Sequence, residues 1–152
     1  MDTVNVSAVS EEGLLPSPDL KIYDSFESMN LPEKLLRGIF SYGYERPSDI
    51  QTKAIIPIKD GRDVLAQARS GTGKTATFCI GSMCRVNPAV KKMQVLVLVH
   101  TRELAQQIKA VATSLGEYVG ITAYAATGGT PLREDLKALE KGIHIVIGTP
   151  GR

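Results

Sequence analysis

The sequence predicts an α/β fold built on a parallel sheet, and three observations lead to this expectation. Apolar strand candidates alternate with segments of helical periodicity along most of the chain. The run Val95–Val99 is continuously aliphatic, which is typical of a strand buried on both faces of a parallel sheet. A glycine-rich turn at residues 68–75 joins the strand candidate 64–66 to a helical stretch.

Composition restricts the class of protein. The chain has 152 residues and 43% hydrophobic content, which is enough for one domain with a buried core. A formal net charge of +2 is too small to argue for nucleic-acid binding by itself. No apolar run approaches the roughly 20 residues of a membrane span, and the N-terminus has no apolar signal segment. We therefore expect a soluble intracellular protein without membrane association. We also expect a monomer, located in the cytoplasm or alternatively in the nucleus.

The two cysteines, Cys79 and Cys84, have the spacing of neither a metal site nor a redox motif. We expect two reduced thiols, which agrees with an intracellular compartment.

Residues 1–21 are expected to form a tail, because they combine Ser, Pro, Glu and Asp without helical or strand periodicity. A helix is expected from Asn30, which can cap it with Pro32 in the first turn, to about Gly43.

A second helix is expected from Ser48 to Pro57, because Ser48 and Gln51 match the spacing of a capping box. Gln51 has another interpretation, since its carbonyl and NH₂ also match the N6/N7 edge of adenine. Local sequence alone favours the cap.

The turn after the first strand has the composition of a phosphate-binding loop. Its glycines allow backbone N–H groups to converge on phosphate oxygens, and the following helix N-terminus favours an anion. Lys74 can reach the β- and γ-phosphates of a nucleotide, and the Thr75 hydroxyl can ligate the Mg²⁺ that bridges them. The alternative is a tight turn with no ligand. The candidate binding residues are Ala68, Arg69, Ser70, Gly71, Thr72, Gly73, Lys74, Thr75 and Ala76.

The strand 95–99 leads into a helix that Thr101 can cap, with apolar residues through Leu115 along one side. Arg102 and Glu103 lie at the carboxyl end of that strand, where open α/β sheets bind ligands. A solvated helix start is the alternative, and an isolated pair favours it.

A third strand is expected at residues 121–125, followed by Gly128 and Gly129, which permit positive φ or close approach of another backbone. A helix from Pro131 to about Gly142 and a fourth strand at 144–148 complete the pattern. His144 is expected to be an ordinary strand-edge residue and no ligand.

Taken in order, these motifs resemble the first RecA-like domain of the DEAD-box ATP-dependent RNA helicases, and among these the eukaryotic translation-initiation helicase most closely. The resemblance covers residues 22–152 as a partial ATP-binding domain, with a Q motif at 24–52. The motifs are Phe26, Gly43–Gln51, Ala68–Thr75, Thr101–Gln107, Gly128–Gly129 and Thr149–Arg152.

The resemblance implies ATP and Mg²⁺ as cofactors. Lys74 and Thr75 take catalytic roles, and Thr75 is the metal ligand. Phe26 stacks on adenine with the Arg46 stem nearby, and Gln51 reads adenine, which reverses the local preference for the cap.

The resemblance also implies single-stranded RNA, held by its backbone, as a ligand, and translation-initiation scaffold proteins as partners. The implied activity is RNA-stimulated ATP hydrolysis coupled to RNA unwinding, in translation initiation or RNA processing. The implied RNA-binding residues are Thr101, Arg102, Gly128, Gly129, Thr149 and Arg152.

The sequence departs from the family pattern at Asp49, Arg69 and His100, the last in place of a proline. It also contains no Asp-Glu-Ala-Asp segment. We therefore expect an incomplete RecA-like domain, truncated before that motif, with a gap beside the phosphate-loop strand and negligible ATPase activity when tested alone. Two alternatives are a truncated, non-enzymatic protein that competes for helicase partners or RNA, and a different P-loop NTPase such as a metabolic kinase.

Overall fold

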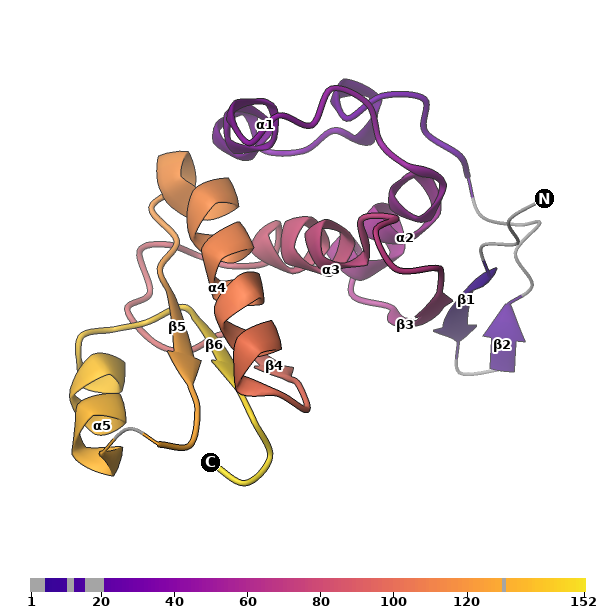
Figure 1. Ribbon diagram of the computed structural model, residues 1–152. Helices are drawn as coiled ribbons and strands as arrows, with labels where there is room; N and C mark the ends of the chain where they lie inside the picture. The colour runs from indigo at the N-terminus through magenta and orange to yellow at the C-terminus, as the bar shows by residue number, and fades with distance from the viewer. Residues whose placement is uncertain (1–4, 11–12, 16–20, 130) are drawn as a thin grey trace. The chain divides into compact units, whose positions relative to one another are not determined.

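The computed structural model describes residues 5–10, 13–15, 21–129 and 131–152. The chain divides into two compact units, residues 1–85 and residues 86–152 (Figure 1). Within the described ranges, no helix is both long enough and apolar enough to cross a bilayer.

The first unit combines helices with one small sheet. The sheet has the order β2-β1-β3, and both pairings are antiparallel. α2 packs against α3 and against β3. The elements are β1 (Asn5–Ser10), β2 (Gly13–Leu15), a 3-10 helix η2 (Glu27–Met29), α1 (Glu33–Ser41), α2 (Asp49–Lys59), β3 (Asp63–Gln67) and α3 (Lys74–Met83).

The expected tail at residues 1–21 is wrong in part, because 5–10 and 13–15 form β1 and β2. The other positions in 1–20 lie outside the described residues. The physical reason is that the edge of β3 carries backbone N–H and C=O groups that need hydrogen-bond partners. An extended segment satisfies them through its own backbone, so this pairing needs little periodicity in the sequence.

The core of the first unit begins where α2 covers β3. Ile50 and Ala54 of α2 are buried, and Val64 and Ala66 pack against them from alternate positions of β3. Leu65 points to the other face of the strand and is 67% exposed. One face of β3 is therefore covered and the other is open.

The expected helix start, with Asn30 as the N-cap, is wrong by two residues. α1 begins at Glu33 with Pro32 as its N-cap residue, and Asn30 instead ends η2 in the left-handed region, with φ 50°. Lys59 of α2 donates to the Asn30 carbonyl at 2.8 Å. Asparagine tolerates the left-handed conformation better than most residues. Asn30 therefore ends η2 and does not start α1.

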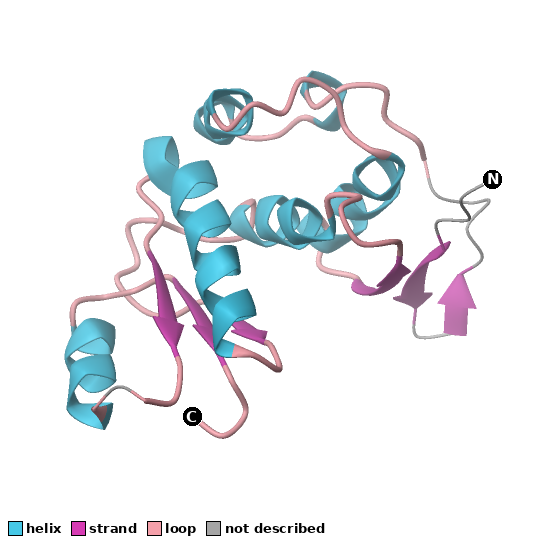
Figure 2. Ribbon diagram, in the orientation of Figure 1, coloured by secondary structure: helices cyan, strands magenta, loops and turns pink. Residues whose placement is uncertain are grey.

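The second unit is a parallel sheet with helices, as Figure 2 shows in magenta and cyan. Its strand order is β4-β6-β5, and α4 packs on β5 and β6. The parallel α/β arrangement is confirmed here, whereas β3 lies in the other, antiparallel sheet. The elements are β4 (Val95–Leu98), α4 (Arg102–Gly116), a 3-10 helix η3 (Glu117–Val119), β5 (Ala123–Ala126), α5 (Leu132–Glu140) and β6 (Ile145–Gly148).

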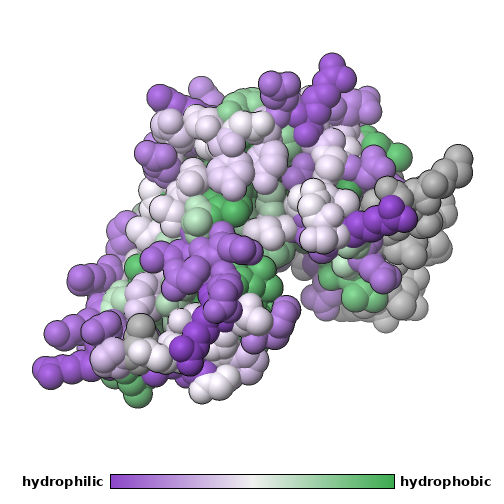
Figure 3. Space-filling model, viewed as in Figure 1, coloured by the Kyte–Doolittle hydropathy of each residue, from purple (hydrophilic) through white to green (hydrophobic). Residues whose placement is uncertain are grey.

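The expectation that the strand at residues 95–99 is buried on both faces is wrong. Leu96 and Leu98 are 56% and 63% exposed, whereas Val95 and Val97 are partly buried. A continuous aliphatic run shows that a strand forms but not which faces are covered. β3 and β4 are each edge strands of their own sheets in the described part of the chain. Figure 3 shows green apolar areas among the polar ones on the face drawn.

His144 immediately precedes β6 and is fully buried. Its Nδ1 accepts the Thr122 N–H at 3.0 Å, so Nε2 carries the proton and donates to the Pro88 carbonyl at 3.2 Å. Both ring nitrogens are thus satisfied within the second unit. The expectation that His144 is no ligand agrees with this geometry, although the residue is a core histidine and not an edge one.

The two thiols are expected to react slowly with alkylating reagents. Burial raises the pKa of Cys79 to about 12 and that of Cys84 to about 11, the latter against an opposing effect of Lys59. The thiolate is the reactive form, so at pH 8 iodoacetamide should modify Cys84 about 100-fold more slowly than an unperturbed thiol. Mass spectrometry of a time course checks this, with the urea-unfolded chain as control. Equal rates in both states would contradict the burial of the thiols.

Candidate functional site

The glycine-rich turn between β3 and α3 forms a loop that is held by contacts among its residues and with Gln51. Gly71 and Gly73 have positive φ, 81° and 92°. A side chain at Gly73 would meet the Gln51 amide, because a Cβ there lies 2.7 Å from Nε2. Only glycine satisfies both constraints, and α3 then begins at Lys74 with its N–H groups directed to the loop.

Lys74 extends back along this loop. Its Nζ donates to the carbonyls of Ala68 at 2.6 Å and Arg69 at 2.5 Å. Thr72 also donates to the Arg69 carbonyl, at 2.8 Å. An ammonium held at the mouth of a loop and before a helix N-terminus is suited to an anion that replaces the two carbonyls.

Ser48 and Gln51 at the start of α2 contact this loop. The Gln51 Oε1 accepts the Ser48 N–H at 2.9 Å, which confirms the predicted cap. The Ser48 hydroxyl donates to the Thr72 carbonyl at 2.7 Å, and the Gln51 Nε2 donates to the Gly73 carbonyl at 3.5 Å. Gln51 is only 2% exposed, so its side-chain amide makes its hydrogen bonds within the protein. Sequence spacing predicted the cap but could not show the contact with the loop 22 residues away.

Phe26, the residue expected to stack on adenine, is fully buried. Its ring packs edge-on against Phe40, with ring centroids 6.4 Å apart. The structure therefore presents no open face of this ring. Arg46, the lesser candidate, is exposed on the segment before α2.

The loop residues fit a nucleotide with its metal in part. The positive-φ glycines, the Lys74 ammonium and the ten-residue helix α3 form a cradle for phosphate. For Mg²⁺ the loop offers the Thr75 hydroxyl, and the described residues contain no cluster of three or more acidic, His or Cys side chains. Mg²⁺ commonly keeps waters and phosphate oxygens as its main ligands, so one hydroxyl is compatible with it.

The second unit has a pocket of about 630 Å³ at the carboxyl end of β4 and β6. Five of the six residues expected to contact RNA line it, and Gly129 is the exception. The lining residues are His100, Thr101, Arg102, Glu103, Gly128, Thr149, Gly151 and Arg152.

Thr101 has a structural role in this pocket, because its hydroxyl accepts the Leu104 N–H at 3.2 Å and caps α4. Arg102 lies over the paired glycines. A Cβ at Gly129 would lie 2.6 Å from its Nη1, and one at Gly128 would lie 3.2 Å from its Nη2. The glycines thus permit close approach, as expected, but of a guanidinium and not of a backbone.

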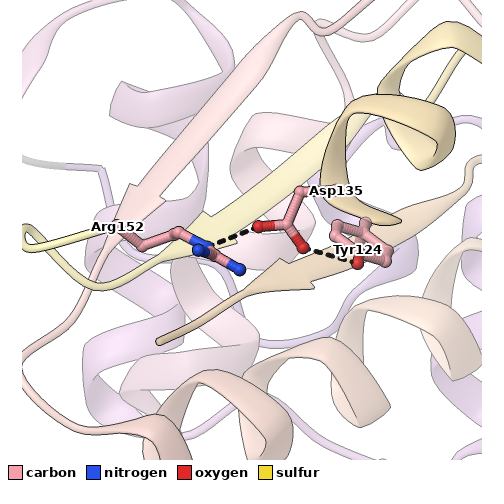
Figure 4. A network of polar contacts seen from close by, with 3 residues as sticks. All are labelled: Tyr124, Asp135 and Arg152. Atoms are coloured by element: carbon pink, nitrogen blue, oxygen red, sulfur yellow. Dashed lines mark hydrogen bonds and ion pairs between the residues drawn. The ribbon is translucent and has the colours of Figure 1, made fainter. Parts of the chain in front are cut away.

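Arg152 is held by a network that sequence reasoning did not find (Figure 4). Its Nε donates to Asp135 Oδ2 at 2.6 Å, and the Tyr124 hydroxyl donates to Asp135 Oδ1 at 2.8 Å. Burial, reinforced by this hydrogen bond, raises the pKa of the Tyr124 phenol. One signal was available, because Asp135 falls at helical spacing among the leucines of α5.

Comparisons with known proteins give one family. The model of the DEAD/DEAH box helicase family matches residues 48–152. The chain is 51% identical over 146 residues to "Eukaryotic initiation factor 4A" of Drosophila melanogaster, covering 96% of this chain and 36% of that protein. It is 55% identical over 141 residues to "ATP-dependent RNA helicase eIF4A" of Neosartorya fischeri, covering 93% and 35%.

A solved structure gives the same result. The RNA helicase Prp28 of Chaetomium thermophilum bound to ADP superposes with a TM-score of 0.76 at 30% identity, over 97% of this chain and 36% of that one. The chain therefore spans about a third of the length of the proteins it matches.

Proposed function

Because the chain belongs to the DEAD/DEAH box helicase family, we propose that it supplies the ATP-binding loop and an RNA-backbone pocket of an ATP-dependent RNA helicase. The observation that carries the nucleotide part is the Lys74 ammonium, held by two loop carbonyls in front of α3. A triphosphate can replace both carbonyls and gain charge-assisted hydrogen bonds.

We propose that Lys74 contacts the β- and γ-phosphates and that the Thr75 hydroxyl holds Mg²⁺. Bound Mg²⁺ neutralises charge that develops on the phosphates during transfer. We propose Gln51 for reading adenine, although this requires its amide to exchange an internal partner for the base. Phe26 contributes by stacking only if its ring becomes exposed.

For RNA, we propose that the pocket of the second unit contacts phosphates through Arg102, Arg152 and the hydroxyls of Thr101 and Thr149, with Gly128 and Gly129 allowing close approach. Contacts of this kind carry little base information, so binding should be sequence-tolerant and salt-sensitive.

RNA-stimulated hydrolysis, strand separation and a role in translation initiation are proposals for the whole protein. They are supported by the similarity to "Eukaryotic initiation factor 4A" of Drosophila melanogaster. We also propose translation-initiation scaffold proteins as partners of the whole protein. Its proposed location is the cytoplasm or alternatively the nucleus.

The adenine preference tests the nucleotide part of this proposal. In displacement of a fluorescent ATP analogue, ATP should compete better than GTP. Gln51→Ala should reduce the ATP-to-GTP ratio to about one, because a lost base hydrogen bond is worth about 0.5–1.5 kcal/mol.

Ser48→Ala is the matched control, since it removes the hydroxyl that donates to the Thr72 carbonyl but keeps the backbone N–H that donates to Gln51 Oε1, so the base-reading side chain is untouched. It should weaken ATP and GTP equally. If ATP and GTP displace the analogue equally from the unaltered chain, Gln51 does not read adenine.

A further inference from the structure

Asp135 is the one buried acidic side chain among the described residues, with 4% of its surface exposed. A carboxylate removed from water is unfavourable unless its oxygens are paired. Both are paired here, Oδ1 by the Tyr124 hydroxyl and Oδ2 by Arg152 Nε (Figure 4). Asp135 also lies in the first turn of α5, where the helix dipole favours negative charge.

The bond to Arg152 is made through Nε, the guanidinium donor nearest the aliphatic stem. Holding Nε fixes the plane of the guanidinium and therefore the direction of its two Nη groups. The backbone of Arg152 is held as well, because its N–H donates to the Thr149 carbonyl at 2.9 Å. Arg152 therefore enters the pocket wall as an ordered donor, with 17% of its side chain exposed.

We propose that Asp135 and Tyr124 are positioning residues for RNA binding, which hold the Arg152 guanidinium in the orientation that meets a phosphate of single-stranded RNA. This inference rests on the proposed function of the pocket. Without the two partners, a long side chain would have to be immobilised when RNA binds, and that ordering weakens the complex.

The charge of Asp135 acts in the opposite direction, because a carboxylate beside an arginine lowers its attraction for phosphate. Two variants separate orientation from charge. Asp135→Asn removes both the charge and the strong acceptor, whereas Tyr124→Phe preserves every charge and removes only the hydroxyl that fixes the carboxylate. Loss of binding in Tyr124→Phe therefore reports orientation alone.

The test is fluorescence anisotropy of a labelled oligouridine with the 152-residue chain and its variants, at several salt concentrations. Asp135→Asn should bind about 3- to 10-fold more weakly and Tyr124→Phe about 2- to 3-fold more weakly, with little change in salt dependence. Glu134→Gln, which removes the same charge at the exposed neighbouring residue, should change the affinity by less than about 2-fold. Arg152→Ala should lower the salt slope by about 0.7, and adding Asp135→Asn to it should cause no further weakening.

A second measurement does not involve RNA. The ¹⁵N relaxation of the Arg152 Nε–H should show an ordered group in the unaltered chain and a mobile one in Asp135→Asn. Thermal melts of each variant give its folded fraction, which keeps the test valid if a variant loses stability.

The outcomes separate the two proposals. If the chain binds RNA and both variants bind like Glu134→Gln, or if Arg152 stays ordered in Asp135→Asn, the positioning role is overturned and the RNA function stands. If the unaltered chain shows an ordered Arg152 but no RNA binding, the proposed RNA function of the pocket is overturned, and the role of the network in RNA binding falls with it.

Discussion

Lys74→Ala is expected to weaken binding of a fluorescent ATP analogue by about 10- to 100-fold, because one charge-assisted interaction with phosphate is worth about 1.5–3 kcal/mol. The ammonium now donates to the carbonyls of Ala68 and Arg69, and ATP binding redirects it to the phosphates. Titration of the analogue, followed by its fluorescence, measures the change.

Lys34→Ala is a suitable control, because Lys34 is exposed on α1 and lies outside the loop. It removes the same unit charge and should leave the affinity within about 2-fold of the original. Thermal melting of both variants separates binding from folding. An affinity for Lys74→Ala equal to that of the control would show that the loop does not use this lysine for phosphate.

His144→Ala is expected to lower the free energy of unfolding by about 2–4 kcal/mol. The change leaves a cavity at a fully buried position and removes the partners of the Thr122 N–H and the Pro88 carbonyl. Urea denaturation followed by circular dichroism measures the loss.

His144→Asn tests the origin of this effect, since its Oδ1 can replace the Nδ1 acceptor but its amide cannot reach Pro88. It should be intermediate between the original chain and His144→Ala. If His144→Ala is as stable as the original chain, the two hydrogen bonds of the ring make no net contribution.

Local signals in the sequence predicted local structure well. The Ser48–Gln51 cap and the Thr101 cap depend on residues three apart, and both form. Asn30 shows the limit of this reasoning, because a residue suited to a helix start is also suited to the left-handed end of η2.

Contacts between distant segments could not be predicted in this way. β1 pairs with β3 across more than 50 residues, and no periodicity in residues 1–21 indicates it. The network of Tyr124, Asp135 and Arg152 joins a strand, a helix and the segment after β6. The resemblance singled out only Arg152 of these three, and only the fold brings it together with Tyr124 and Asp135. Exposure of Leu96 likewise depends on which surfaces other elements cover.

The open edge of β4 has a consequence for the behaviour of the chain at high concentration. A strand with unpaired backbone groups and two exposed leucines is a template on which another copy can add a strand and begin aggregation. A net charge of +2 provides little repulsion between copies. Lys91 and Lys92 precede β4 and act as gatekeepers at one end of it. We therefore expect these two lysines to contribute to the colloidal stability of the isolated chain.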